Sequence, residues 1–392
     1  MKSKNVFSHI GRFGVLLSAF FVTALSPVPP QRTVVINQNY PNNPGKIWIQ
    51  GDTLFVNDRY TGVHIYDIAD PSAPVHTGFI LISNNIDIAV LGDTLYADSY
   101  GNLLVYDIST LSNIRLMKTI SNAVTFNYDY FFGVWYDEFG MPLYYDDYYG
   151  GGFGCMCMSA PSAMPSYSAD GGGSSGQGGS TARFAVYNNQ YLYTLKDGSV
   201  IKGYNITVTT NPVAISSGAY IPNSDAETLF PYEHYLFVGA STGVYIYSLL
   251  DPDNPAYVSQ MLHVRAMDPV VVQSNIAYVT LRNAMEYPWN RFEIIDLGDF
   301  TNMTVLSAVP MNYPYGLTVR GKYVYICDSY NGIEICDISN PSEVSRINFY
   351  PGFATYDAIA YGDLLIITGN EVRIYSLTNT NSAIPEYLSA LH

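Results

Sequence analysis

Residues 51–74 read GDTLFVNDRYTGVHIYDIADPSAP, residues 92–110 read GDTLYADSYGNLLVYDIST, and residues 321–344 read GKYVYICDSYNGIEICDISNPSEV. These stretches are variants of one unit. Self-similarity at a fixed period is the signature of a repeat architecture, in which each unit buries its apolar faces against its neighbours. The fold of this chain therefore depends on how often the unit recurs and on which strands it contains.

The repeat can be counted from the dipeptide that ends its most regular segment. Asp67 and Asp107 are 40 residues apart, whereas 98 residues separate Asp107 from Asn205, so about 55 extra residues are inserted there. The dipeptide occurs at Tyr66-Asp67, Tyr106-Asp107, Tyr204-Asn205, Tyr247-Ser248, Ile295-Asp296, Cys336-Asp337 and Tyr375-Ser376. The sequence therefore contains seven units.

Each unit is expected to form four short strands, named A to D in chain order. In the second unit these are DIAVL, TLYAD, LLVYDIS and RLMKTI. Turn residues such as Ser241-Thr242-Gly243 and Asn331-Gly332 separate strands B and C, and Asp-Pro pairs follow strand C. Four-stranded units at this period predict an all-β, seven-bladed β-propeller, with one long insertion between blades 2 and 3. A β-sandwich array is the alternative, and it does not explain so regular a period.

The N-terminus has the layout of a secretory signal peptide. Basic residues precede the apolar run GVLLSAFFVTAL, which is too short for a comfortable membrane span, and small residues and prolines follow it. We assign residues 1–26 to the signal peptide, with a retained signal anchor as the alternative. No cysteine lies near the cleavage region, so we expect a secreted, periplasmic or cell-surface protein that is not an N-terminal lipoprotein and has no membrane span after cleavage.

Residues 44–391 are assigned to the propeller, interrupted by an insertion at 123–182. The insertion begins rich in tyrosine and acids and ends in DGGGSSGQGGS, a composition typical of a flexible linker. Residues 27–43 are either a linker or the source of a ring-closing strand, for which Thr33–Asn37 is the candidate. In the alternative, Pro385 to Leu391 complete the last blade alone.

The strings GVHIYDIADPSAP, LLVYDIST and GIEICDISNPSEV resemble the LVIVD repeat of bacterial extracytoplasmic propellers, over most of residues 44–390. The resemblance implies the fold and no settled biochemical activity. Many members of that family are lipoproteins, and this chain departs from them because it lacks a leader cysteine.

The composition narrows the partners. The net charge is −15 and the pI is about 4.6, which argues against nucleic acid and anionic membranes as partners. We expect a monomer that binds a protein, a glycan or a cation.

Several local motifs resemble catalytic or metal sites. Gly239-Ala240-Ser241-Thr242-Gly243 matches the pattern GxSxG, but it falls on a B–C hairpin rather than on a strand–turn–helix elbow, so a plain turn is expected. The histidines show no metal-binding spacing. Cys155-Met156-Cys157-Met158 is a soft-ligand cluster that would suit Cu(I), with incidental or oxidised cysteines as the alternative.

Cys327 and Cys336 flank the turn at Asn331-Gly332. If this turn has two residues, the cysteines lie directly opposite on strands B and C, at a Cα separation of about 4.5 Å. That separation is within disulfide range, so a cross-strand disulfide is predicted, with two small packed thiols as the alternative.

The start of each strand A faces one mouth of the central channel, and charged residues lie near that point in five units. They are Asp87, Arg183, Glu227, Asp268 and Asp357. The insertion and the B–C loops with Arg59, Arg282 and Trp289 should emerge on the same face. This arrangement predicts a ligand or cation site at the mouth, provided that the strand register is right to one residue. Solvated charge at loop ends is the alternative.

Propellers include both binders and enzymes, so the fold alone does not decide function. We expect a non-enzymatic binding module that uses its loop face and channel mouth, without a cofactor apart from a cation at the mouth. The alternative is an extracytoplasmic hydrolase or lyase whose site is at the mouth.

Overall fold

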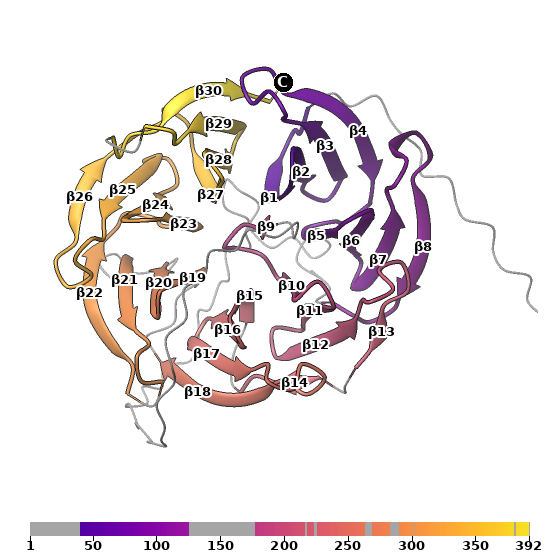
Figure 1. The fold of residues 1–392 in the computed structure, drawn as a ribbon, viewed down its shortest axis with the longest axis horizontal. Helices are drawn as coiled ribbons and strands as arrows, with labels where there is room; N and C mark the ends of the chain where they lie inside the picture. Colours follow the sequence, from indigo (N-terminus) through magenta and orange to yellow (C-terminus); the bar gives the residue numbers. More distant parts are fainter. Residues whose placement is uncertain are drawn as a thin grey trace, which may run out of the picture. The chain divides into compact units, whose positions relative to one another are not determined.

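The computed structural model describes residues 40–124, 177–215, 218–222, 226–262, 269–282, 290–300, 302–379 and 382–391. These residues form seven antiparallel sheets arranged as a ring of blades, and the innermost strand of each blade faces the centre (Figure 1). The predicted seven-bladed β-propeller is confirmed.

The blades follow one another in chain order, and each runs from its inner to its outer edge. Blades 1 and 2 contain β1 (Pro44–Gln50), β2 (Thr53–Asp58), β3 (Gly62–Asp67) and β4 (Val75–Leu81), then β5 (Ile88–Leu91), β6 (Thr94–Ser99), β7 (Asn102–Asp107) and β8 (Arg115–Ile120), with a short 3₁₀ turn at Leu111–Asn113. Blade 3 contains β10 (Phe184–Tyr187), β11 (Tyr191–Lys196) and β12 (Val200–Asn205), with an outer edge split into β13 (Val213–Ala214) and β14 (Ala219–Tyr220).

The remaining four blades each have four strands. Blade 4 contains β15 (Ala226–Tyr232), β16 (Tyr235–Ala240), β17 (Gly243–Ser248) and β18 (Ala256–Leu262), and blade 5 contains β19 (Val270–Gln273), β20 (Ile276–Leu281), β21 (Arg291–Asp296) and β22 (Thr304–Pro310). Blade 6 contains β23 (Leu317–Arg320), β24 (Tyr323–Cys327), β25 (Ile333–Asp337) and β26 (Ser345–Asn348), and blade 7 contains β27 (Thr355–Tyr361), β28 (Leu364–Gly369), β29 (Val372–Ser376) and β30 (Glu386–Ala390).

The repeated dipeptide has the same structural role in all seven blades. Its second residue ends strand C, and its side-chain oxygen accepts a hydrogen bond from the backbone N–H two residues later, as from Ala69 to Asp67 at 2.9 Å. Asp, Asn and Ser can all make this local bond, which favours a turn over a longer strand. The apolar residue between this acceptor and its N–H donor is buried in every blade: Ile68, Ile108, Ile206, Leu249, Leu297, Ile338 and Leu377.

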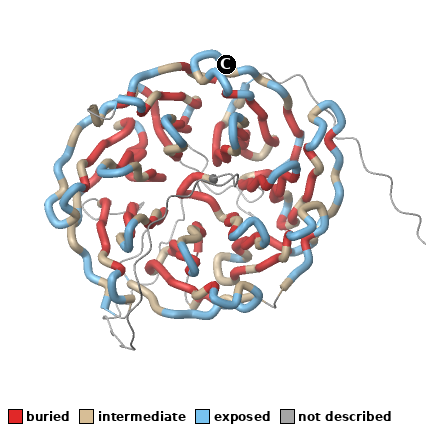
Figure 2. The backbone as a smooth tube through the Cα atoms, viewed as in Figure 1, coloured by how far each residue is buried: buried red, intermediate tan, exposed pale blue. Residues whose placement is uncertain are grey.

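The hydrophobic core lies between the blades rather than in one centre. Each buried cluster joins neighbouring blades, so the inner and middle strands are buried on both faces while the outer strands are exposed (Figure 2). Blades 7 and 1 are joined in the same way by a cluster that includes Ile47, Tyr66, Ile359 and Ile374. Strand β30 completes blade 7 from the C-terminal residues, as in the second of the two predicted closures; Thr33–Asn37 lies outside the described residues.

The predicted disulfide is wrong, because the B–C hairpin of blade 6 is wider than a two-residue turn. Cys327 lies opposite Ile333, and Cys336 lies opposite Val324, so Asp328 to Gly332 form a five-residue loop. Cys327 is buried between blades 6 and 7, whereas Cys336 is buried between blades 5 and 6. The two free thiols therefore lie on opposite faces of the blade.

The physical reason for the wider loop is the side chain of Asp328. Its carboxylate accepts hydrogen bonds from the backbone N–H of Tyr313 at 2.6 Å and from Asn312, both in the preceding inter-blade loop. Within the hairpin, Ser329 and Gly332 take positive φ and Asn331 does not. A contact with a distant loop thus overrides the local turn preference of Asn-Gly.

Residues 1–39, and with them the predicted signal peptide, lie outside the described residues, as do residues 125–176 of the insertion. No helix in the described part of the chain is long and apolar enough to cross a membrane. The end of the insertion is described, and it is not a linker: residues 179–182 are buried, and β9 (Gln177–Gly178) pairs with β1 at the centre of the ring (Figure 1).

Candidate functional site

Residues 177–182 occupy the central channel, and we name this segment the plug. The plug continues into blade 3, and it forms hydrogen bonds with four other blades. The backbone N–H of Gly179 donates to Ile47 O in blade 1, and the N–H of Leu229 in blade 4 donates to Ala182 O at 2.9 Å. The N–H of Leu317 in blade 6 donates to Ser180 Oγ at 2.8 Å. In blade 7, Asp357 accepts the bonds described next. The plug therefore fixes the inner strands from around the ring.

Asp357 holds the plug through both oxygens of its carboxylate. Oδ2 accepts a hydrogen bond from Thr181 Oγ1 at 2.6 Å, and Oδ1 accepts bonds from Ser180 Oγ at 3.2 Å and from the backbone N–H of Ala358 at 2.9 Å. Gly179 allows this close approach, because a Cβ atom there would lie 1.9 Å from Asp357 Oδ2. The glycine of an apparent linker is thus required by tertiary packing.

Asp87 binds the residue that follows the plug. Its Oδ2 accepts a hydrogen bond from the backbone N–H of Arg183, and its Oδ1 accepts one from Ile88 at 2.8 Å. Burial raises the pKa of Asp87 to about 6, opposed mainly by the nearby ammonium group of Lys46. Burial likewise raises the pKa of Asp357, again opposed by Lys46. One lysine thus compensates two buried carboxylates.

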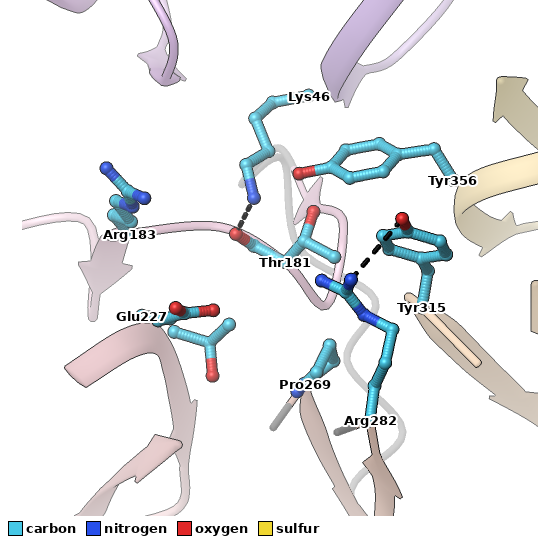
Figure 3. Close-up of a pocket in the computed structure, with 9 residues that line it drawn as sticks. Lys46, Thr181, Arg183, Glu227, Pro269, Arg282, Tyr315 and Tyr356 are labelled. Atoms are coloured by element: carbon cyan, nitrogen blue, oxygen red, sulfur yellow. Dashed lines mark hydrogen bonds between the residues drawn. The ribbon is translucent and has the colours of Figure 1, made fainter. Parts of the chain in front are cut away.

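We call the side of the plug where the inner strands begin the upper side. There the channel mouth narrows to a cavity of about 20 Å³, which is room for about one water molecule. Three basic side chains and one acidic side chain line it, together with two tyrosines and the plug residue Thr181. Figure 3 shows these side chains around Thr181. The lining residues are Lys46, Thr181, Arg183, Glu227, Thr228, Pro269, Arg282, Tyr315 and Tyr356.

β-Bulges at the start of three inner strands direct side chains toward this mouth. In blade 4 the register passes from Ala226 to Thr228, so Glu227 is the extra residue, and in blade 7 Tyr356 is the extra residue in the same way. A similar irregularity in β1 includes Lys46. Bulges commonly re-aim a side chain beside a functional site. Three of the mouth-lining side chains therefore come from irregular positions.

The tyrosines of the mouth stack against its cations. Arg282 Cζ lies 4.0 Å from the ring centroid of Tyr315, and Lys46 Nζ lies 5.4 Å from that of Tyr356. Arg59 lies over the same Tyr356 ring at 5.1 Å, and the rings of Tyr315 and Tyr356 are 5.5 Å apart. Cation–π contacts of this kind hold the positive groups in place.

The predicted acidic ring does not form. Asp87 and Asp357 are fully buried and bind backbone and hydroxyl groups, whereas Arg183, Glu227 and Arg282 line the mouth as predicted. Asp268 and Trp289 lie outside the described residues. The cause is the plug and the residue that follows it, because the hydroxyl groups of Ser180 and Thr181 bind Asp357 and the backbone N–H of Arg183 binds Asp87. Sequence reasoning missed Lys46, Tyr315 and Tyr356.

The charged side chains that line the mouth are mostly basic, and one of them, Lys46, also compensates the buried carboxylates of Asp87 and Asp357. The described lining of the mouth has two more basic than acidic side chains, although the whole chain carries a net charge of −15. The described residues contain no group of three His, Cys, Asp or Glu that could hold a metal ion, and Cys155–Met158 lies outside them. A carboxylate, sulfate or phosphate oxygen is the group that guanidinium and ammonium donors bind best.

The remaining sequence motifs lie away from the mouth. Ala240 pairs with Gly243, so the GxSxG pattern is a two-residue hairpin turn, as predicted. His64 is buried in blade 1, where its Nδ1 lies 3.0 Å from Nε2 of His76 and its Nε2 lies 3.7 Å from Asp58 Oδ2. These groups belong to the packing between strands β2, β3 and β4.

A scan against protein-family models matches the LVIVD repeat at residues 43–80, 84–121 and 315–350. These ranges correspond to blades 1, 2 and 6 and the loops beside them, so the resemblance predicted from the sequence is confirmed. A search of curated proteins finds no significant match.

Solved structures show the same fold at low sequence identity. A protein from Lactobacillus plantarum is 12% identical, with a TM-score of 0.58 over 89% of this chain and 96% of its own. The periplasmic gluconolactonase of Pseudomonas aeruginosa is 10% identical, with a TM-score of 0.53 over 89% and 96%. BamB from Moraxella catarrhalis is 9% identical, with a TM-score of 0.50 over 84% and 80%. Such likeness shows the fold and not the function.

Proposed function

Taking the chain as a seven-bladed propeller with LVIVD repeats, we propose that it is an extracytoplasmic, non-enzymatic binding module for ligands that carry an acidic group. One observation carries the proposal: Lys46, Arg183 and Arg282 converge on a mouth that is closed below by the plug. The acidic group enters the mouth, and the rest of the ligand lies across the loop face.

The size of the mouth sets how a ligand binds. A cavity of about 20 Å³ has room for one oxygen atom of an acidic group and not for a whole sugar or side chain. The loops on the same face present exposed tyrosines, among them Tyr100, Tyr330 and Tyr350, which are 45%, 71% and 59% exposed. Tyrosine supplies a rigid ring and a hydroxyl group at binding surfaces. A sugar or peptide body can therefore contact these rings while its acid is held in the mouth.

The enzymatic alternative needs titratable groups that face the cavity. The carboxyl groups of Asp87 and Asp357 have raised pKa values, but their oxygens bind the plug and the backbone. The cation proposed from the sequence would be repelled, because three of the four charged side chains that line the mouth are basic.

The proposal predicts that charge decides binding. In calorimetric titrations at low salt, we expect the protein to bind trigalacturonate and not the neutral maltotriose. Arg183→Met should weaken trigalacturonate binding about tenfold or more, because a charge-assisted hydrogen bond contributes about 1.5–3 kcal/mol. Added salt should weaken binding further.

The matched control is Arg115→Met, which removes an exposed arginine from the outer strand β8. It should leave the affinity for trigalacturonate unchanged. Equal affinity for the charged and neutral trisaccharides, or equal weakening by both arginine variants, would contradict an anion site at the mouth.

A further inference from the structure

The channel on the other side of the plug holds a second, larger cavity of about 450 Å³. Its ceiling is formed by the plug residues Gly178, Gly179, Ser180 and Ala182, and its walls by the inner strands of blades 3 to 7 together with Trp48 of blade 1. This volume is in the range of small-molecule sites, which is about 300–1,000 Å³. The plug therefore separates two sites with different sizes.

The chemistry of this cavity differs from that of the mouth. None of the described side chains that line it is charged. Its lining includes the half-buried apolar residues Val186, Phe230 and Val271. The inner strands are sheet edges, and edges present backbone N–H and C=O groups. Transfer of an ion from water into such a cavity costs much free energy, whereas transfer of an uncharged molecule with an apolar body costs little.

Three of the polar side chains of the lining already have partners in the protein, whereas the indole Nε1 of Trp48 is buried without a hydrogen-bond partner in the described part of the chain. Thr318 Oγ1 accepts a hydrogen bond from the backbone N–H of Ala360 at 3.0 Å, Gln273 Nε2 donates to Gly321 O at 3.0 Å, and Ser180 Oγ bonds to Asp357. Ligand recognition therefore falls mainly to the apolar residues of the lining and the strand edges, with Trp48 as the lining residue whose N–H donor is unused.

The rim of the cavity carries more acidic than basic side chains. The turns that follow the inner strands surround this end of the channel, and four of them carry an exposed acid, of which Asp363 pairs with Arg320, against one exposed lysine, Lys322. The acids are Asp52, Asp93, Glu233 and Asp363. An acidic rim over an uncharged cavity selects against the ligands that the mouth favours.

From these observations we propose that the channel below the plug is a binding site for an uncharged small molecule with an aromatic or branched apolar body. The site goes beyond the proposed function, because it lies on the opposite side of the plug and takes ligands of the opposite character.

Two dyes with the same aromatic body test this proposal. N-phenyl-1-naphthylamine is uncharged, and 8-anilino-1-naphthalenesulfonate carries a sulfonate. We expect the uncharged dye to bind with saturable, one-to-one fluorescence enhancement. Val271→Phe should weaken that binding at least tenfold, because Val271 is half-buried and lines the cavity, so the larger ring reduces the space for the dye.

Two control variants separate this site from the rest of the molecule. Val258→Phe makes the same change on the exposed outer strand β18 and should leave dye binding unchanged. Arg183→Met removes a charge from the mouth and should also leave it unchanged. If Val271→Phe lowers the melting temperature, Val186→Phe on the wall formed by β10 replaces it.

Two outcomes would overturn the proposal. One is that the uncharged dye shows no saturable binding to the native protein. The other is that folded Val271→Phe or Val186→Phe binds it as tightly as the native protein does. Failure of trigalacturonate to bind would contradict the anion site at the mouth and would leave the proposal for the lower cavity unaffected.

Discussion

Replacement of Asp357 by alanine is expected to lower the free energy of unfolding by about 1–3 kcal/mol or more, the cost of leaving a buried hydrogen-bonding group without its partner. The carboxylate of Asp357 is fully buried and accepts hydrogen bonds from Ser180, Thr181 and Ala358. Its loss leaves two plug hydroxyl groups without their acceptor and reduces the compensation of the Lys46 ammonium group. Denaturation in urea measures the effect.

Asp363→Ala is the matched control for this substitution. Asp363 lies on the exposed turn after β27, where it pairs with Arg320 at 2.6 Å. An exposed ion pair contributes about 0–1 kcal/mol, so this variant should unfold close to the native midpoint. Equal destabilisation by both substitutions would show that Asp357 does not hold the plug.

Replacement of Gly179 by alanine is expected to lower the free energy of unfolding by about 1–3 kcal/mol, as overpacking of a well-packed interior does. The added methyl group would lie 1.9 Å from Asp357 Oδ2, and the carboxylate can move away only by disturbing its hydrogen bonds to Ser180 and Thr181. Thermal or urea unfolding measures the difference from the native protein.

Gly78→Ala is the control, because a Cβ atom at Gly78 meets only Ile65 Cδ1 at 3.9 Å. This variant should be as stable as the native protein or slightly more stable, since alanine restricts the unfolded chain more than glycine does. If alanine at position 179 were tolerated equally well, the glycine-rich end of the insertion would not be packed in the channel.

The features that could be predicted from the sequence are those that depend on local contacts. The residue that ends strand C at Asp67, Asp107 and their equivalents bonds to the backbone two residues later, so its position can be read from a single repeat. The hairpin at Ser241-Thr242 is likewise local. Seven copies of the same local pattern fix the number of blades.

The features that sequence reasoning missed depend on contacts between distant residues. The plug has the composition of a linker, and Asp357, which holds it, lies 176 residues after Thr181. The bulge that makes Tyr356 an extra residue at the mouth has no signal within its own strand, so the sequence does not point to this side chain. The loop of Asp328 to Gly332 widens for the same kind of reason, and it separates Cys327 from Cys336.

Both proposed sites depend on the plug, because it is the floor of the mouth and the ceiling of the lower cavity. Hydrogen exchange at the backbone amides of residues 179–183, followed by mass spectrometry in the full-length protein, tests its position most directly. The amides of Gly179, Ala182 and Arg183 donate to Ile47, Gly179 and Asp87, so they should exchange as slowly as those of the inner strands β1 and β5. Exchange at the rate of an unstructured peptide would mean that the channel is open throughout, and it would contradict the division into two sites.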